Sequence, residues 1–298
     1  VNYSKNDYRM KDVEMRDETG DRFITGNPKR FHDGYFSLLT QIEAGIVNKS
    51  WADEFFVSAS YSKTDKELQT GSVQTKVYGM AERNSDAWNV SARYGKYNFL
   101  TEGMTLKATL SHTWDHSITV DTAYRKYYWD GGYIVSQRNE IRGGEPSMRH
   151  YKRPLTIARA NLDYRLDGHH SFNLNYHLSR TGNDRYDDLD QSFVPSNDAV
   201  TKHIIGLTYS QSFFDGRMQN VFFAKDYVNH PNIRQTDQST VTGSNKVQGS
   251  TTKNYFGYGT GLRYMFFEPL AVKVSYEHSV RLPIARELLG NGTTVYAN

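Results

Sequence analysis

The chain has 298 residues, of which 37% are hydrophobic and 14% aromatic, and it contains 22 tyrosines but no cysteine. The lack of cysteine excludes disulfide bonds, thiolate metal ligands and cysteine nucleophiles from this chain. Its 36 basic and 33 acidic residues leave a net charge of +3, which is too balanced to indicate a nucleic-acid partner. No apolar run approaches the ~18 residues that a membrane-spanning helix needs.

Ten segments along the chain alternate between apolar and polar residues. In the last of them, Leu270, Val272 and Val274 alternate with Ala271, Lys273 and Ser275. Successive side chains of a strand point to opposite faces, so each segment is predicted to be a strand with one apolar and one polar face. In chain order the predicted strands lie at 36–46, 55–61, 88–94, 104–114, 158–166, 172–178, 205–213, 221–227, 256–266 and 270–281.

Short and long connections alternate between these segments. The tight joints fall at 48–52, 100–103, 167–169, 215–216 and 268–269, and long polar segments lie at 122–149, 187–199 and 231–251. Outer-membrane barrels have short periplasmic turns and longer extracellular loops. The pattern therefore predicts an all-β fold, an antiparallel up-and-down transmembrane β-barrel with the tight joints in the periplasm. The modest hydrophobic content agrees with this, because half of each strand would face a polar lumen.

The two ends of the chain are predicted to lie outside the strands. Residues 1–33 are typical of a polar extracellular loop, residues 34–282 contain the ten strands, and residues 283–298 begin another extracellular loop with a short helix. Pro283 suits the first turn of that helix and Gly290 can close it. Unpaired strands at both edges would expose backbone groups that lipid cannot satisfy, so we expect a piece of a longer protein.

The segment 275–298, SYEHSVRLPIARELLGNGTTVYAN, resembles the late barrel region of TonB-dependent outer-membrane receptors, where a strand ends in Arg-x-Pro followed by Glu-Leu and Gly. The matching residues are Arg281, Pro283, Glu287, Leu288 and Gly290. Looser similarity to the same family covers 33–56, 77–99 and 161–178. We expect these motif residues to be structural, with Arg281 at the outer rim beside Glu287 or another loop carboxylate.

The resemblance implies a barrel of ~22 strands in the outer membrane of a Gram-negative bacterium, of which ten would be a little under half. Such a receptor imports a large scarce nutrient, usually a ferric siderophore, with haem, cobalamin or an oligosaccharide as other cargoes. The implied partners are outer-membrane lipid and the TonB complex, reached through a plug domain that has no counterpart here, and a surface lipoprotein is a further candidate. Two alternatives stay open: a passive outer-membrane porin, and a soluble or surface-bound β protein that binds glycans.

One aromatic segment is a candidate ligand site. Tyr124, Tyr127, Tyr128, Trp129 and Tyr133 lie beside Arg125 and Lys126, and Arg138 and Arg142 follow in the same predicted loop. Flat rings and cations can hold an aromatic, anionic or sugar ligand. The alternative is an aromatic girdle with basic side chains that reach the membrane interface. Arg149 and Lys152 would also suit an anionic ferric complex, although solvated loop charge explains them equally well.

We predict no metal site, no cofactor and no catalytic site. The acidic group Asp184, Asp187, Asp188 and Asp190 does not have the spacing of a calcium-binding loop and is predicted to be a hydrated loop. His112 and His116 share a strand face but lie roughly 13 Å apart at ~3.3 Å per residue, too far to chelate one ion. His169 and His170 lie on opposite sides of a turn. No Gly-x-Ser-x-Gly or His-Glu-x-x-His motif occurs, so the chain is predicted not to be an enzyme.

Overall fold

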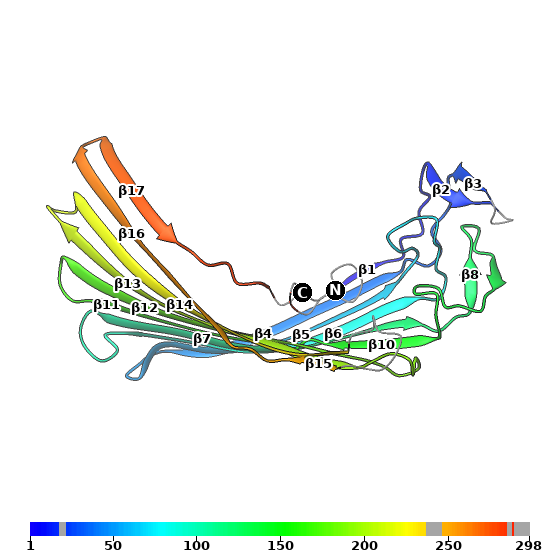
Figure 1. Cartoon of the computed structure of the whole chain (residues 1–298), viewed down its shortest axis with the longest axis horizontal. Helices are drawn as coiled ribbons and strands as arrows, with labels where there is room; N and C mark the ends of the chain where they lie inside the picture. The colour runs from blue at the N-terminus through cyan, green and yellow to red at the C-terminus, as the bar shows by residue number, and fades with distance from the viewer. Residues whose placement is uncertain (18–21, 237–245, 285–287, 289–298) are drawn as a thin grey trace.

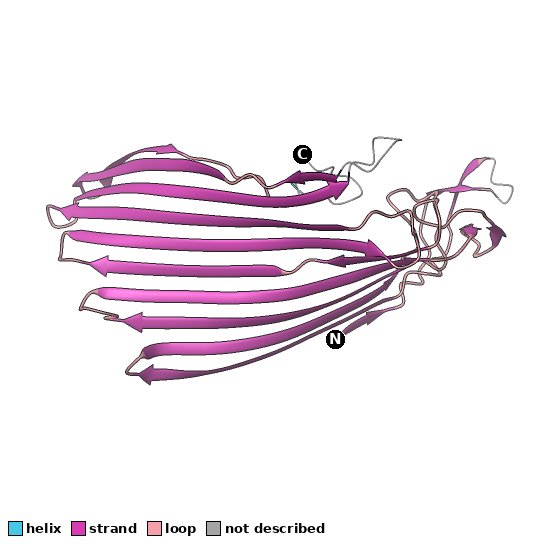
Figure 2. Cartoon of the chain, turned by 60° about the horizontal axis from the view of Figure 1, so that its bottom comes forward, coloured by secondary structure: helices cyan, strands magenta, loops and turns pink. Residues whose placement is uncertain are grey.

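The computed structural model describes residues 1–17, 22–236, 246–284 and 288. Its main element is one antiparallel sheet, bent into an open trough, in which ten crossings lie side by side (Figures 1 and 2). The crossings are β4 (Tyr35–Lys49), β5 (Ala52–Glu67), β6 (Glu82–Tyr97), β7 (Met104–Asp121), β10 with β11 (Ser147–Lys152 and Leu155–Arg165), β12 (His170–Asp187), β13 (Ser196–Phe213), β14 (Met218–Thr236), β16 (Lys253–Phe267) and β17 (Leu270–His278).

The other strands are short. β1 (Asn2–Ser4) pairs with β4, and β15 (Lys246–Gly249) pairs with β14. Two separate hairpins, β2 (Val13–Arg16) with β3 (Phe23–Gly26) and β8 (Arg125–Tyr127) with β9 (Tyr133–Val135), lie beyond the long-loop end of the sheet (Figure 1). No helix in the described residues combines the length and apolar character that a membrane-spanning helix requires.

The predicted fold class, strand order and alternation of connections are confirmed. Every crossing pairs with its chain neighbours in up-and-down order, and all five tight joints lie at one end of the sheet (Figure 2). Gly103 illustrates how tight a joint is: its φ of +78° is unfavourable for other residues, and a Cβ there would lie 2.5 Å from the Arg165 carbonyl oxygen.

Most strands are longer than predicted and extend toward the long loops. β12 and β13, for example, run to Asp187 and from Ser196, where the sequence pattern indicated only polar loop. The reason is that apolar alternation records contact with lipid, and a strand that continues into water keeps its hydrogen bonds but loses the alternation. Beyond the apolar segments, the sequence therefore could not show where a strand ends.

One crossing is interrupted because proline cannot donate to a ladder. β10 and β11 both pair with β7 and β12, and Pro154 lies between them. Opposite Pro154, the amide of Gly182 donates to its carbonyl at 2.8 Å, and a Cβ at Gly182 would come within 2.8 Å of the proline ring. A glycine opposite the proline lets the two strands stay in register on both sides of the break.

The two faces of the sheet differ in chemistry. Directly opposed residues share a face, and this places Tyr61, Trp88 and Trp114 in one aromatic row. A second aromatic row nearer the tight turns consists of Tyr164, Phe172, Tyr209 and Phe222. Between the rows lie aliphatic side chains such as Leu110, which is 54% exposed because no second layer covers it among the described residues.

The opposite face carries small polar and charged residues. Ser58, Ser91 and Ser111 lie in one row, and Lys107 and Asn161 oppose each other in another. An apolar band between two aromatic rows, backed by a polar face, is the surface that an outer-membrane barrel presents to lipid and lumen. A glycan-binding sandwich would instead bury this band under a second sheet.

Candidate functional site

The long loops fold into a compact lobe at the extracellular end of the sheet. The lobe combines the N-terminal segment with the β5–β6 loop (68–81) and the β7–β10 loop (122–146). Its buried core consists of Val13, Val77, Tyr127 and Trp129, against which Met10 and Met15 pack. The indole Nε1 of Trp129 donates to the Gln74 carbonyl at 3.0 Å, so this ring is fixed in place.

Buried polar side chains join the three segments of the lobe. Gln69 is 1% exposed; its Oε1 accepts from the amides of Phe31 and His32 at 2.6 and 2.8 Å, and its Nε2 donates to the Tyr78 carbonyl at 2.9 Å. One amide side chain thus ties the N-terminal segment to the β5–β6 loop. Such buried groups fix a loop only when their hydrogen bonds are made.

Two buried carboxylates hold the β7–β10 loop. Asp121 at the end of β7 accepts from the amides of Glu140 and Ile141 at 2.8 and 2.9 Å. Glu140 Oε2 in turn accepts from the amides of Gly79 and Met80 at 2.9 and 3.2 Å. Burial raises the pKa of Glu140, and these amide donors offset only part of that effect.

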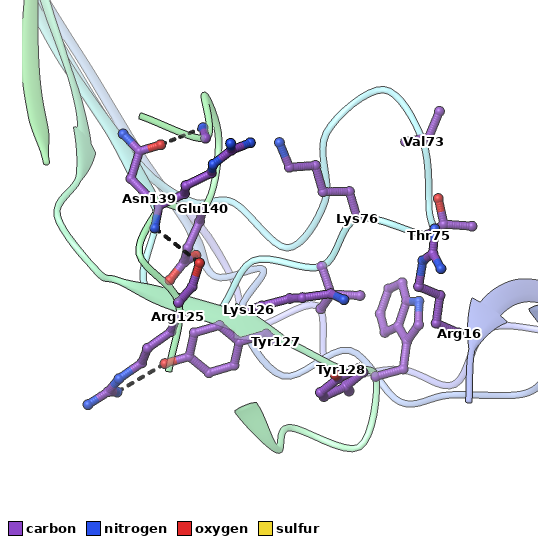
Figure 3. Close-up of a pocket in the computed structure, with 15 residues that line it drawn as sticks. Arg16, Val73, Thr75, Lys76, Arg125, Lys126, Tyr127, Tyr128, Asn139 and Glu140 are labelled. Carbon is purple, nitrogen blue, oxygen red and sulfur yellow. Dashed lines mark hydrogen bonds between the residues drawn. The ribbon is translucent and has the colours of Figure 1, made fainter. Parts of the chain in front are cut away.

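A cavity of about 580 Å³ opens between the loops of the lobe (Figure 3). Its walls are rich in cations and aromatic rings, with one acidic residue. The charged and aromatic residues that line it are Arg16, Lys76, Arg125, Lys126, Tyr127, Tyr128, Trp129, Arg138 and Glu140. Five cations around one carboxylate create a positive local field that favours an anionic occupant.

The cations of this pocket are held mainly by uncharged groups. Lys76 Nζ donates to the Ile141 carbonyl at 2.6 Å. Arg125 donates to the Tyr127 hydroxyl at 3.1 Å and lies 4.2 Å from the centre of the Tyr133 ring. Within the part of the chain that the structure describes, no ion pair joins Lys76, Arg125, Lys126 or Arg138 to a carboxylate. Their charge is therefore available to a ligand.

The predicted ligand residues divide into two groups. Tyr127, Tyr128, Trp129 and Arg138 line the pocket, and the burial of Tyr127 and Trp129 places these two rings in the lobe core instead of a membrane girdle. Tyr124 and Arg142 do not line it. Tyr124 donates to Glu145 at 2.6 Å, a bond that raises the pKa of Tyr124, and Arg142 donates to the Tyr151 hydroxyl at 3.1 Å.

Two cations of the pocket were absent from the prediction. Arg16 comes from β2 and Lys76 from the β5–β6 loop, far along the chain from residues 124–142. The sequence signal for a shared core was weak: Val13 and Val77 are hydrophobic residues in mainly polar segments.

Two members of the acidic group at the end of β12, Asp187 and Asp190, form ion pairs with Arg149. The prediction of a hydrated loop is therefore wrong for Asp187. Arg149 Nε lies 3.1 Å from Asp187 and Arg149 Nη2 lies 3.3 Å from Asp190, with the Asp187 side chain 0% exposed. Burial raises the pKa of Asp187, but hydrogen bonds from the Ser147 hydroxyl and three backbone amides outweigh it and lower the pKa to about 2. Arg149 is thus committed to an ion pair, and neither it nor Lys152 lines the pocket.

The motif residues that carry the family resemblance are only partly described. The Pro283 carbonyl accepts a hydrogen bond from Lys202 of β13, and the Leu288 amide donates to the Ile284 carbonyl at 3.2 Å. Arg281 is described as well. Glu287 and Gly290, and with them the predicted Arg281–Glu287 pair and most of the short helix, lie outside the described residues.

The histidines named from the sequence have separate partners. His112 Nδ1 lies 2.8 Å from the Thr156 hydroxyl, and His116 Nε2 lies 3.0 Å from His150 Nδ1. His169 and His170 contact the Ser212 carbonyl and the Tyr209 hydroxyl, respectively. Within the described ranges, no group of three or more histidine, aspartate or glutamate side chains is arranged to hold a metal ion.

The antiparallel up-and-down sheet, its lipid-facing band and its unequal connections define a transmembrane β-barrel protein of the outer membrane of a Gram-negative bacterium. No family model matches the sequence, and no curated protein matches it.

A solved structure shares the fold. The copper transporter OprC, an outer-membrane β-barrel, aligns with 88% of this chain at a TM-score of 0.63 and 10% sequence identity. The aligned chain spans 39% of the transporter's length. At this identity the likeness establishes the fold.

Proposed function

We propose that this chain is the barrel portion of a TonB-dependent outer-membrane receptor that imports a ferric siderophore or a related anionic iron complex. The cationic pocket in the extracellular lobe is the observation that carries this proposal. A passive pore needs a polar constriction, whereas a receptor needs a concave site outside the membrane where a scarce ligand is first held. The motif at 281–290 supports the same family.

The chemistry of the pocket favours a complex over a bare metal ion. Five cations repel a free metal cation, and they attract a chelate whose carboxylate, phenolate or hydroxamate groups leave a net negative charge. The rings of Tyr127 and Tyr128 add flat surfaces for an aromatic or planar part of such a chelate. The solved neighbour is named as a copper transporter, which agrees with a metal-containing cargo for this barrel fold.

Uptake by the full-length parent protein tests the proposal. The variant Lys76→Gln/Lys126→Gln/Arg138→Gln removes three pocket cations and leaves polar side chains in their place. A control, Lys11→Gln/Lys66→Gln/Lys253→Gln, removes three exposed lysines that do not line the pocket. Hydrogen bonds to charged groups contribute about 1.5–3 kcal/mol each, so we expect the pocket variant to bind its iron complex on the order of 100-fold or more weakly.

The probes are ⁵⁵Fe-labelled catecholate, hydroxamate and carboxylate complexes, offered to cells that carry each variant. The proposal predicts that at least one complex is taken up by the wild-type protein, is lost in the pocket variant and is retained in the control. Equal uptake by both variants would show that the pocket does not bind the cargo. Uptake of none of the complexes by the wild-type protein would contradict an iron-complex receptor.

A further inference from the structure

A chain of four titratable side chains crosses the outer rim of the sheet, away from the pocket. His116 Nδ1 lies 3.6 Å from Asp86 Oδ1, His116 Nε2 lies 3.0 Å from His150 Nδ1, and His150 Nε2 lies 2.9 Å from Asp188 Oδ2. These residues belong to β6, β7, β10 and the start of the β12–β13 loop. The chain therefore links four consecutive parts of the rim.

The row formed by the Asp86, His116, His150 and Asp188 side chains faces the external medium. Asp86 opposes His116 in the β6–β7 ladder, two positions beyond the opposed pair Trp88 and Trp114. All four thus share the outward face, and the histidines lie just past the aromatic row on the extracellular side. The Asp86 and Asp188 side chains are 47% and 51% exposed, whereas the His150 side chain is 9% exposed.

The geometry between the two rings is that of a hydrogen bond. Their nitrogens approach to 3.0 Å while the ring centres stay 5.2 Å apart and the planes differ by 11°, so the rings meet edge to edge. On its other side, His150 stacks on Tyr186 with centres 4.4 Å apart and planes 6° apart. His150 is therefore held between a strand neighbour and a second histidine.

This arrangement limits how many protons the pair can hold. His150 Nε2 donates to Asp188, and the facing nitrogens His116 Nε2 and His150 Nδ1 share one proton, because one of them must accept. His116 Nδ1 lies 3.6 Å from Asp86, beyond hydrogen-bond distance. Two neutral rings carry two protons, and these complete both hydrogen bonds when they lie on His116 Nε2 and His150 Nε2. Protonation of both rings places two N–H groups and two positive charges against each other, which breaks the central hydrogen bond.

We propose that His116 and His150 form a proton-operated latch, closed near neutral pH and opened when both rings are protonated. Opening would remove the side-chain tie between β7 and β10, which lie side by side in the sheet. β10 is the returning end of the β7–β10 loop, so the latch would loosen the part of the lobe that leads from the pocket back to the membrane. The latch does not depend on which cargo the pocket binds.

The charges around the histidine pair are mixed in sign. Lys63 of β5 opposes Asp86 and pairs with Asp65 at 3.0 Å. Lys152 of β10 opposes both His116 and Asp184 and lies 5.0 Å from the centre of the Tyr186 ring. Imidazole is the side chain whose charge ordinarily changes between about pH 5 and 8, so a comparison across that range tests this pair.

Hydrogen exchange of the full-length protein tests the latch. Backbone protection of 147–152 is compared at about pH 7.5 and about pH 5, which bracket imidazole titration, after correction for the pH dependence of intrinsic exchange. We expect protection in the wild type to fall on the order of tenfold or more at the lower pH, relative to peptides from β13 and β14. The same protection at both values would overturn the proposal.

His116→Gln keeps a hydrogen-bonding partner for His150 but removes the second titrating ring, so its 147–152 peptide should respond little to pH. His150→Phe keeps the ring against Tyr186 and should abolish the response from the other side of the pair. His170→Gln, near the periplasmic turns, is the control and should respond like the wild type. A full pH response in either latch variant would overturn the proposal.

Discussion

Replacing Val274 by arginine tests the assignment of the two faces. Val274 opposes Leu262 on the apolar face and is 64% exposed. It lies four residues from Leu270, about 13 Å along the strand at ~3.3 Å per residue, which is near the middle of an apolar band roughly 25 Å tall. An arginine on the lipid face costs about 2–4 kcal/mol at this depth, or roughly 30- to 1,000-fold in the folding equilibrium.

The matched control is Lys273→Arg, one residue away. Lys273 opposes Arg263 on the polar face, so this variant also carries an arginine but directs it into the lumen, and its stability should stay within about 0.5 kcal/mol of the wild type. The assay is urea-dependent folding of the full-length protein into lipid vesicles, read by the gel shift between folded and heated barrel. Equal losses in the two variants would refute the assignment of lipid and lumen faces.

Three further predictions concern the rim and the lobe. Arg149→Ala removes the ion-pair partner of the buried Asp187, to which the Ser147 hydroxyl and three amides still donate, and should destabilise the rim by about 3 kcal/mol, the lower end for a broken buried pair. Arg153→Ala, at an exposed neighbour, should change little, and local hydrogen exchange measures both variants. Because the folded pKa of Asp187 is lowered to about 2, its stabilisation, about 2.5 kcal/mol, is present above the unfolded value of ~3.9 and lost as pH falls toward 2. Thermal unfolding should show this loss in the wild type but not in Asp187→Asn. Deleting 124–133 removes Tyr127 and Trp129 from the lobe core and should abolish uptake while the folded barrel still shows its gel shift; unchanged uptake would contradict the site.

The membrane-facing part of the fold could be predicted from the sequence because lipid and lumen impose opposite chemistry on alternate residues. The alternation of Val272 and Val274 with Lys273 and Ser275 indicates a strand and shows which of its two faces is apolar. The tight joints were equally visible, since a periplasmic turn leaves no room for a long polar segment. These two signals sufficed for the strand order and the up-and-down fold.

The lobe could not be predicted in the same way, because its order depends on contacts between segments far apart in the chain. Val13, Val77 and Trp129 meet in one core, but they come from three separate segments, and no sequence pattern links one segment to another. The pairing of His116 with His150 was also hidden. The sequence places His112 and His116 on one strand, whereas the hydrogen-bond partner of His116 is His150 on the neighbouring strand β10.

The dependence of uptake on cellular energy tests the central proposal most directly. Cells that carry the full-length parent protein are given a ⁵⁵Fe-labelled complex that the protein takes up, with and without a protonophore that collapses the inner-membrane proton gradient. A TonB-dependent receptor predicts saturable uptake that stops when the gradient is lost, although the complex stays bound at the cell surface. Uptake that continues without the gradient and rises in proportion to concentration would identify a passive pore and contradict the proposal.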